Sequence, residues 1–147
     1  VASFDPRATA GSFDFVAGFF ILHHLPDVAA AIRALVAALG PAGAMAFVVP
    51  NRRNPLFLAH VLFCPDMTWR EERGMFRLSA RRTEAPFRAA GLAPRPTKRF
   101  GFFPPQVYNR FAPARALEQG VERIRVLRPV LPFLLLVGGR GQAPDER

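Results

Sequence analysis

The sequence has very little cysteine and no long apolar run. Cys64 is the only cysteine among 147 residues, which excludes an intrachain disulfide framework and suits a reducing compartment, so we expect a cytoplasmic location. The longest apolar runs, residues 15–22 and 130–138, are much shorter than the roughly 20 residues that a membrane-spanning helix needs. The first residues also lack the basic start of a secretory signal. We therefore expect a soluble protein and no transmembrane segment, with peripheral membrane contact left open.

Acidic residues are scarce, and the net charge is +9. This charge permits nucleic acid, anionic lipid or acidic substrates as partners. The segment 70–99 holds much of the positive charge, but its aromatic residues do not alternate with arginines as a nucleic-acid stacking platform requires. A solvated basic surface is the simpler interpretation, and we expect no specific nucleic-acid partner. Half of the residues are apolar, which excludes global disorder and is enough for a core.

A strand–helix–strand unit occupies the first third of the chain. Residues 13–22 are almost wholly apolar, which is typical of a strand buried on both faces of a parallel sheet. Asp27 is placed as the N-cap of a helix over residues 28–39, and Gly40 as its left-handed end. Residues 44–49 form the second buried strand. Such units are nearly always right-handed parallel crossovers, so the fold class is α/β.

The rest of the chain gives weaker signals. In order, we expect a short helix over residues 56–63, an irregular or helical segment over 66–78 and a helix that is capped by Ser79, runs to Ala90 and stops at Gly91. An edge strand or extended loop over 95–103, a helix over 114–128 and a strand over 130–137 follow. No internal domain boundary is visible. We expect one domain over residues 1–139 and a flexible tail over residues 140–147.

Polar side chains follow both predicted strands of the first unit. His23 and His24 follow the first strand, and Asn51 and Asn54 follow the second. Ligands of open parallel sheets bind outside the carboxyl ends of the strands, so this rim is the candidate site. Adjacent strand residues point to opposite faces, so at most one of the two histidines faces a ligand. We favour His23, and a backbone hydrogen bond is the simpler role for His24.

Metal binding is not expected. His60 and Cys64 are four residues apart and could share a helix face. A zinc site needs three or four protein ligands, however, so a buried thiol beside an ordinary histidine is the better interpretation.

Three ordered motifs resemble class I S-adenosylmethionine-dependent methyltransferases. Residues 11–16 read GSFDFV, residues 22–27 read LHHLPD, residues 39–43 read LGPAG, and residues 87–92 add FRAAGL. Within that class the chain is similar to methyltransferases of type 11, the ubiquinone-biosynthesis-like enzymes. Ala42 departs from the first glycine of their usual Pro-Gly-Gly turn. The resemblance covers about residues 1–139 and is strongest over 11–51.

The resemblance implies part of a Rossmann-like methyltransferase sheet. Residues 13–22 and 44–49 correspond to its strands four and five, residues 95–103 and 131–137 to its final antiparallel pair, and residues 1–5 to the tail of strand three. The family holds its cofactor with a glycine-rich turn and an acidic residue that belong to the amino-terminal half. We expect this chain to lack that half. A missing segment or a partner chain would then supply it.

The resemblance also implies a cofactor and roles for single residues. The cofactor is S-adenosyl-L-methionine, with Ala17, Gly18 and Phe19 beside its methionine portion and Asp5 near its adenine. His23 falls at the mouth of the substrate pocket, where it accepts a proton if the acceptor is a hydroxyl. The substrate-binding candidates on the same rim are His24, Asn51 and Asn54.

Two functions from different classes remain. The leading hypothesis is methyl transfer to a small molecule, with this chain as the substrate-side half. An apolar or lipid-like molecule is one option for this acceptor. The alternative is a non-catalytic α/β module that pairs with a cofactor-binding partner or binds an anionic surface through residues 70–99.

Overall fold

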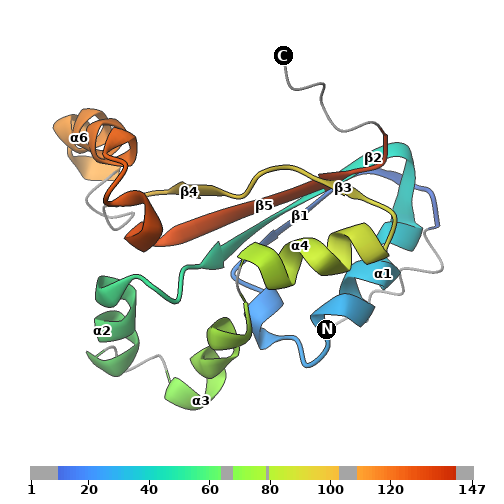
Figure 1. The fold of residues 1–147 in the computed structure, drawn as a ribbon, viewed down its shortest axis with the longest axis horizontal. Coiled ribbons are helices and arrows are strands. Elements are labelled where there is room, and N and C mark those ends of the chain that lie inside the picture. Colours follow the sequence, from blue (N-terminus) through green and yellow to red (C-terminus); the bar gives the residue numbers. More distant parts are fainter. Residues whose placement is uncertain (1–9, 64–67, 79, 103–108, 142–147) are drawn as a thin grey trace.

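The chain folds around one five-stranded sheet. The computed structural model describes residues 10–63, 68–78, 80–102 and 109–141 (Figure 1). Strands β1 (Phe13–Phe19), β2 (Leu39–Pro50) and β5 (Phe133–Gly139) lie side by side in that order. β1 and β2 are parallel, whereas β5 runs antiparallel to β2. The short strands β3 (Ala93–Pro94) and β4 (Lys98–Phe100) pair antiparallel with β5. The parallel first unit and the antiparallel final strands are as the sequence predicts.

Helices and short 3-10 helices connect these strands. They are η1 (Leu22–His24), α1 (Val28–Ala38), α2 (Pro55–Phe63), α3 (Trp69–Glu72), η2 (Arg73–Arg77), α4 (Ala80–Ala89), α6 (Ala112–Arg123) and η3 (Arg128–Val130). The predicted cap of α1 is confirmed, because Asp27 Oδ1 accepts a hydrogen bond of 2.9 Å from the Ala30 amide. In the described part of the chain, no helix is both long and apolar enough to cross a membrane.

The core lies between the sheet and the helices α1 and α4, which lie on the same side of the sheet and contact each other (Figure 1). Every second residue of β2 points into it, so that Met45, Phe47 and Val49 are buried. The core also contains Leu22, Ile32, Val36, Leu39, Leu78, Phe87, Leu92, Leu134 and Leu136. Phe47 from the sheet and Phe87 from α4 meet edge to face, with ring centroids 6.3 Å apart.

Two glycines make room for these rings. A Cβ atom on Gly18 would lie 2.5 Å from the Phe47 ring, and a Cβ on Gly138 would overlap the Phe87 ring. Any side chain at either position would push a core ring out of place, so both glycines serve packing.

The expectation of a first strand buried on both faces is wrong. β1 ends at Phe19, and Phe20 adopts a left-handed backbone with a φ of 54°, which turns the chain into η1. Phe15 is 56% exposed and Phe19 is 70% exposed. Side chains of a strand alternate between its two faces, and the described residues leave uncovered the face of β1 that carries Phe13, Phe15 and Phe19. β1 is also an edge strand, because among the described residues it pairs only with β2.

The end of the first helix also differs from the prediction. Gly40 does not take a left-handed conformation. Instead Leu39 turns directly to an extended conformation, and β2 begins there without an intervening loop. The expected left-handed stop at Gly91 is confirmed by its φ of 81°.

Two expectations concern the ends of the chain. Arg140, the first residue of the expected tail, is held in place: its amide donates to the Gly43 carbonyl and its guanidinium donates to the Val36 carbonyl. Residues 142–147 lie outside the described residues, so the flexible tail stays a prediction. Residues 1–9 also lie outside them, with Asp5 and the expected tail of strand three.

The exposed apolar edge leads to a prediction about association. Exposed β-strand edges pair with other chains unless charges or prolines protect them, and Asp14 is the only charged residue of β1. We expect the chain to self-associate through β1. Phe15→Lys should weaken that association about tenfold or more, because burying one such side chain contributes roughly 1.5–3 kcal/mol. Size-exclusion chromatography with light scattering, combined with a thermal melt, measures this.

Phe111→Lys is the matched control, since Phe111 is 53% exposed and precedes α6 outside the sheet. Equal effects of the two substitutions would contradict the role of β1. So would a wild-type chain that is monomeric and melts cooperatively above about 60 °C, the upper part of the usual range for mesophilic domains.

Candidate functional site

The two histidines follow β1 on η1, at the carboxyl end of the strand. The expectation that strand alternation places them on opposite faces is wrong, because a 3-10 helix and not a strand carries them. Their rings contact each other, with centroids 3.9 Å apart and planes tilted by 42°. They differ in burial instead: His23 is 5% exposed, whereas the side chain of His24 is 44% exposed.

A buried carboxylate joins the two histidines. Glu72, the last residue of α3, places Oε2 3.2 Å from Nε2 of His23 and Oε1 4.0 Å from Nε2 of His24. Its side chain is only 11% exposed. Water therefore solvates this carboxylate poorly, and it depends on the imidazoles for compensation.

The surroundings of His23 determine its protonation state. Burial lowers the pKa of His23 below its ordinary value of 6.5, and nearby His24 lowers it further, whereas Glu72 acts in the opposite direction. The imidazole is therefore neutral at neutral pH. Since Nε2 faces the carboxylate, Nε2 carries the proton and Nδ1 has a free lone pair. Nδ1 is buried and has no hydrogen-bond partner among the described residues.

Gly74 allows this arrangement. A Cβ atom at this position would overlap the main-chain carbonyl oxygen of His23. Without a side chain, the backbone of η2 packs directly on η1, and Glu72 just before η2 comes within reach of both histidines.

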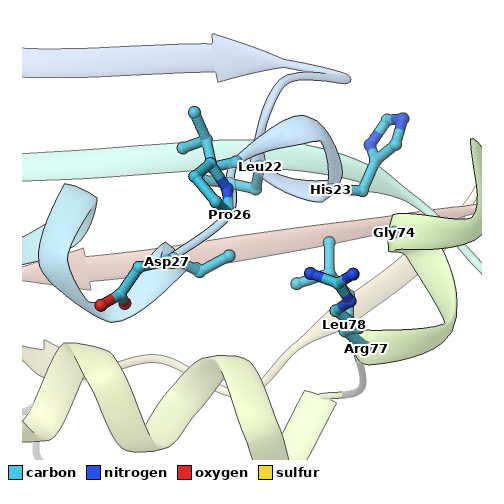
Figure 2. Close-up of a pocket in the computed structure, with 9 residues that line it drawn as sticks. Leu22, His23, Pro26, Asp27, Gly74, Arg77 and Leu78 are labelled. Atoms are coloured by element: carbon cyan, nitrogen blue, oxygen red, sulfur yellow. The ribbon is translucent and has the colours of Figure 1, made fainter. Parts of the chain in front are cut away.

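A pocket of about 460 Å³ lies beside these elements (Figure 2). Its apolar wall includes Leu22 and Leu78, and its charged groups are those of Asp27 and Arg77. In Figure 2 the imidazole of His23 points away from Asp27 and Arg77, so it does not occupy the space between them. The volume falls in the range of small-molecule sites, about 300–1,000 Å³.

The two asparagines hold the protein's own backbone. The Asn51 amide donates to the carbonyls of Pro129 and Leu131 at 2.9 and 2.7 Å. The Asn54 amide donates to the Val130 carbonyl at 2.6 Å, and its Oδ1 accepts from the Phe57 amide at the start of α2. Both side chains therefore fix the loop before β5, and their contact with a substrate stays a prediction.

The expected cofactor residues lie on the carboxyl half of β1. Ala17 and Phe19 are exposed and available to a ligand. Gly18 lies between them, and Phe47 fills the space of its missing side chain.

Glu72, Gly74 and Arg77 could not be identified as site residues from the sequence. Each lies in the segment after β2, far along the chain from the histidines, and no spacing pattern links them. The expectation of no metal site considered His60 and Cys64 and left Glu72 out, yet the structure brings donor atoms of His23, His24 and Glu72 within 4.8 Å of one another.

The basic segment 70–99 does not form one element. It runs through α3, η2, α4, β3 and β4 (Figure 1). Glu84 within it accepts from Arg88 at 3.5 Å and from the Thr97 hydroxyl at 3.1 Å. Part of its charge is therefore compensated locally.

Comparison with known proteins identifies relatives of this fold. A family model described as a methyltransferase domain matches residues 2–120. A search of curated proteins finds no match. Among solved structures, an S-adenosylmethionine-dependent methyltransferase from Archaeoglobus fulgidus matches with a TM-score of 0.56 and 10% identity, over 95% of this chain and 66% of that one.

Two further structures show the same fold. A Haloferax volcanii methyltransferase, solved with its activator, matches with a TM-score of 0.51 and 20% identity over 90% of this chain and 56% of that one. The phosphoethanolamine N-methyltransferase 2 of Haemonchus contortus, in complex with S-adenosyl-L-methionine, has a TM-score of 0.52 and 12% identity over 90% and 34%. The chain thus spans between a third and two thirds of the length of these proteins.

The contact at Gly74 leads to a prediction. Gly74→Ala should lower the free energy of unfolding by about 1–3 kcal/mol, the usual effect of overpacking a well-packed site. Chemical denaturation measures it. Gly120→Ala is the matched control, because a Cβ there meets nothing within 4 Å and α6 gains about 0.5–1 kcal/mol of helix stability. The close packing of η2 on η1 would be refuted if both variants were as stable as the parent chain.

Proposed function

This chain belongs to the methyltransferase domain family. From that membership we propose that it forms the substrate-side half of an S-adenosyl-L-methionine-dependent methyltransferase and binds the methyl acceptor. The observation that carries the proposal is the His23–Glu72 pair, which lies at the end of β1 beside a pocket of small-molecule size. In α/β sheets this end of the strands is where ligands bind. The proposed acceptor is a small molecule, and the single cysteine favours a cytoplasmic setting.

The described residues fit one side of the cofactor. The exposed side chains of Ala17 and Phe19 offer an apolar surface at the carboxyl half of β1. No carboxylate follows β1 or β2 directly: β1 is followed by residues 20–24 and β2 by residues 51–54. When bound, S-adenosyl-L-methionine would supply a methyl group on a sulfonium sulfur, and this sulfur would leave with the electrons of the carbon–sulfur bond when a nucleophile attacks the methyl carbon.

His23 would prepare that nucleophile. Its neutral imidazole, held by Glu72 through Nε2, has the lone pair of Nδ1 available for a proton. A hydroxyl acceptor that reaches this buried nitrogen would donate its proton to Nδ1 as its oxygen becomes bonded to the methyl carbon. The protonated imidazole would then be stabilised by the Glu72 carboxylate. With an amine or carbon acceptor, the same nitrogen would orient the acceptor.

The pocket suggests what kind of acceptor fits. Its apolar wall at Leu22 and Leu78 suits an apolar body, and burial there favours binding. The exposed guanidinium of Arg77 in the same pocket suits an anionic substituent such as a carboxylate. We therefore propose an amphipathic small molecule as the acceptor.

The first prediction concerns turnover in the natural protein that carries these residues. With a hydroxyl acceptor, His23→Ala should reduce turnover by about 10²–10⁴-fold, the usual contribution of a positioned proton acceptor. His24→Ala should reduce it less, because His24 is exposed and further from Glu72. Equal losses with intact folding would remove the reason to choose His23.

The pH profile tests the role of Glu72 as a positioning residue. His23 accepts a proton only when it is neutral, so turnover should fall as the pH drops through its pKa, which burial holds below 6.5. Glu72→Gln removes the carboxylate that raises this pKa, so the acid limb should move to lower pH while turnover drops. An unshifted acid limb in Glu72→Gln would exclude Glu72 as the residue that positions His23.

A natural protein that binds the acceptor but transfers no methyl group would favour the alternative of a non-catalytic module.

Another prediction concerns the 147-residue chain alone. It should bind S-adenosyl-L-methionine weakly or not at all, because its described residues offer mainly apolar contacts from β1, and the Glu72 carboxylate near the end of β1 already faces His23. Isothermal titration calorimetry with the purified chain measures this. A micromolar dissociation constant would contradict it.

A further inference from the structure

Three groups that can bind a metal ion meet at the contact of η1 with α3. They are His23, His24 and Glu72: one donor atom from each lies within 4.8 Å of the other two. The Glu72 carboxylate faces Nε2 of both histidines. We propose that this cluster binds one divalent transition-metal ion of the zinc type.

The spacing of the donor atoms is close to that of a filled site. Zinc lies about 2.0–2.2 Å from imidazole nitrogen and carboxylate oxygen, so tetrahedral donors are about 3.4 Å apart. Here the two imidazole nitrogens lie 3.2 Å and 4.0 Å from the carboxylate oxygens. To bind an ion together with the other two groups, His24 would have to move toward the carboxylate, and its side chain is 44% exposed.

The electrostatics favour a cation. Glu72 is a buried carboxylate, and in the described part of the chain the groups that form ion-pair contacts with it are the two histidines. Burying a carboxylate without a full positive charge beside it is unfavourable. A divalent ion supplies that charge, and the set of two imidazoles and one carboxylate is one that zinc prefers.

The site would be open on one side. Three protein ligands leave the fourth position of a tetrahedral zinc ion free for water or a small molecule. The side chain of His24 is 44% exposed, whereas His23 and Glu72 are buried, so an ion would enter from the His24 side.

Metal binding would regulate the proposed reaction, a consequence that rests on the proposed function. An ion on Nε2 of His23 displaces the proton from that atom, and the neutral imidazole must then carry its proton on Nδ1. Nδ1 can then no longer accept a proton from an acceptor hydroxyl. Zinc should therefore inhibit methyl transfer.

Calorimetric titration of Zn²⁺ into the tag-free 147-residue chain tests the site. We expect one ion per chain. His24→Ala and Glu72→Gln should each weaken the affinity at least tenfold, and His60→Ala, which removes the third histidine of the chain, should leave it unchanged. His24→Ala is the more informative variant, because an exposed side chain can be removed without disturbing the fold. Circular dichroism checks that each variant is folded.

The site would be overturned by an absence of zinc binding, or by equal affinities of the parent chain, His24→Ala and Glu72→Gln. A loss in His60→Ala as large as in His24→Ala would also overturn it. Because these outcomes are read from binding, they are independent of turnover. Zinc bound at the cluster without inhibition of the natural protein would support the site and would overturn the role of Nδ1 in the proposed reaction.

Discussion

The direct contact of the Gly74 backbone with the main-chain carbonyl of His23 is the constraint on which the candidate site depends. Because no side chain separates η2 from η1, Glu72 is carried next to both imidazoles and is buried there. Burial then sets the chemistry: it keeps His23 neutral, and the carboxylate fixes which of its nitrogens carries the proton. The close packing at Gly74 therefore influences the protonation state of His23, which lies much earlier in the chain.

His23, His24 and Glu72 are the side chains of both proposals, proton acceptance and metal binding. The two proposals use different atoms of these side chains. The proposed proton acceptance would use Nδ1 of His23 while Glu72 holds the Nε2 proton. The proposed metal ion would use Nε2 of both histidines and the carboxylate instead. The two states would exclude each other at His23, because a neutral imidazole carries a single proton. Proton acceptance and metal binding would therefore compete for His23.

The amino-acid sequence determined much of the fold by itself. The apolar pattern of residues 13–50 indicated a parallel strand–helix–strand unit, and Asp27 marked the start of α1 to the residue. These signals are local, because strand and helix periods and caps depend on near neighbours in the chain. The motif around residues 22–27 likewise led to the methyltransferase family and to His23 as the candidate. Burial of β1 could not be predicted in this way, since it depends on which strands and helices lie beside it.

Tertiary structure alone decided the partners of the candidate site. No local pattern relates His23 to Glu72 or Gly74, because the three are brought together by the packing of η2 on η1. The end of β1 at Phe19, with its left-handed Phe20, moved both histidines from a strand to a 3-10 helix and made them neighbours on one side. Asn51 and Asn54 looked from the sequence like ligand groups, yet the loop before β5 offered their amides buried carbonyls. A polar side chain binds whatever unsatisfied group the fold places beside it, and that choice is made only when distant segments meet.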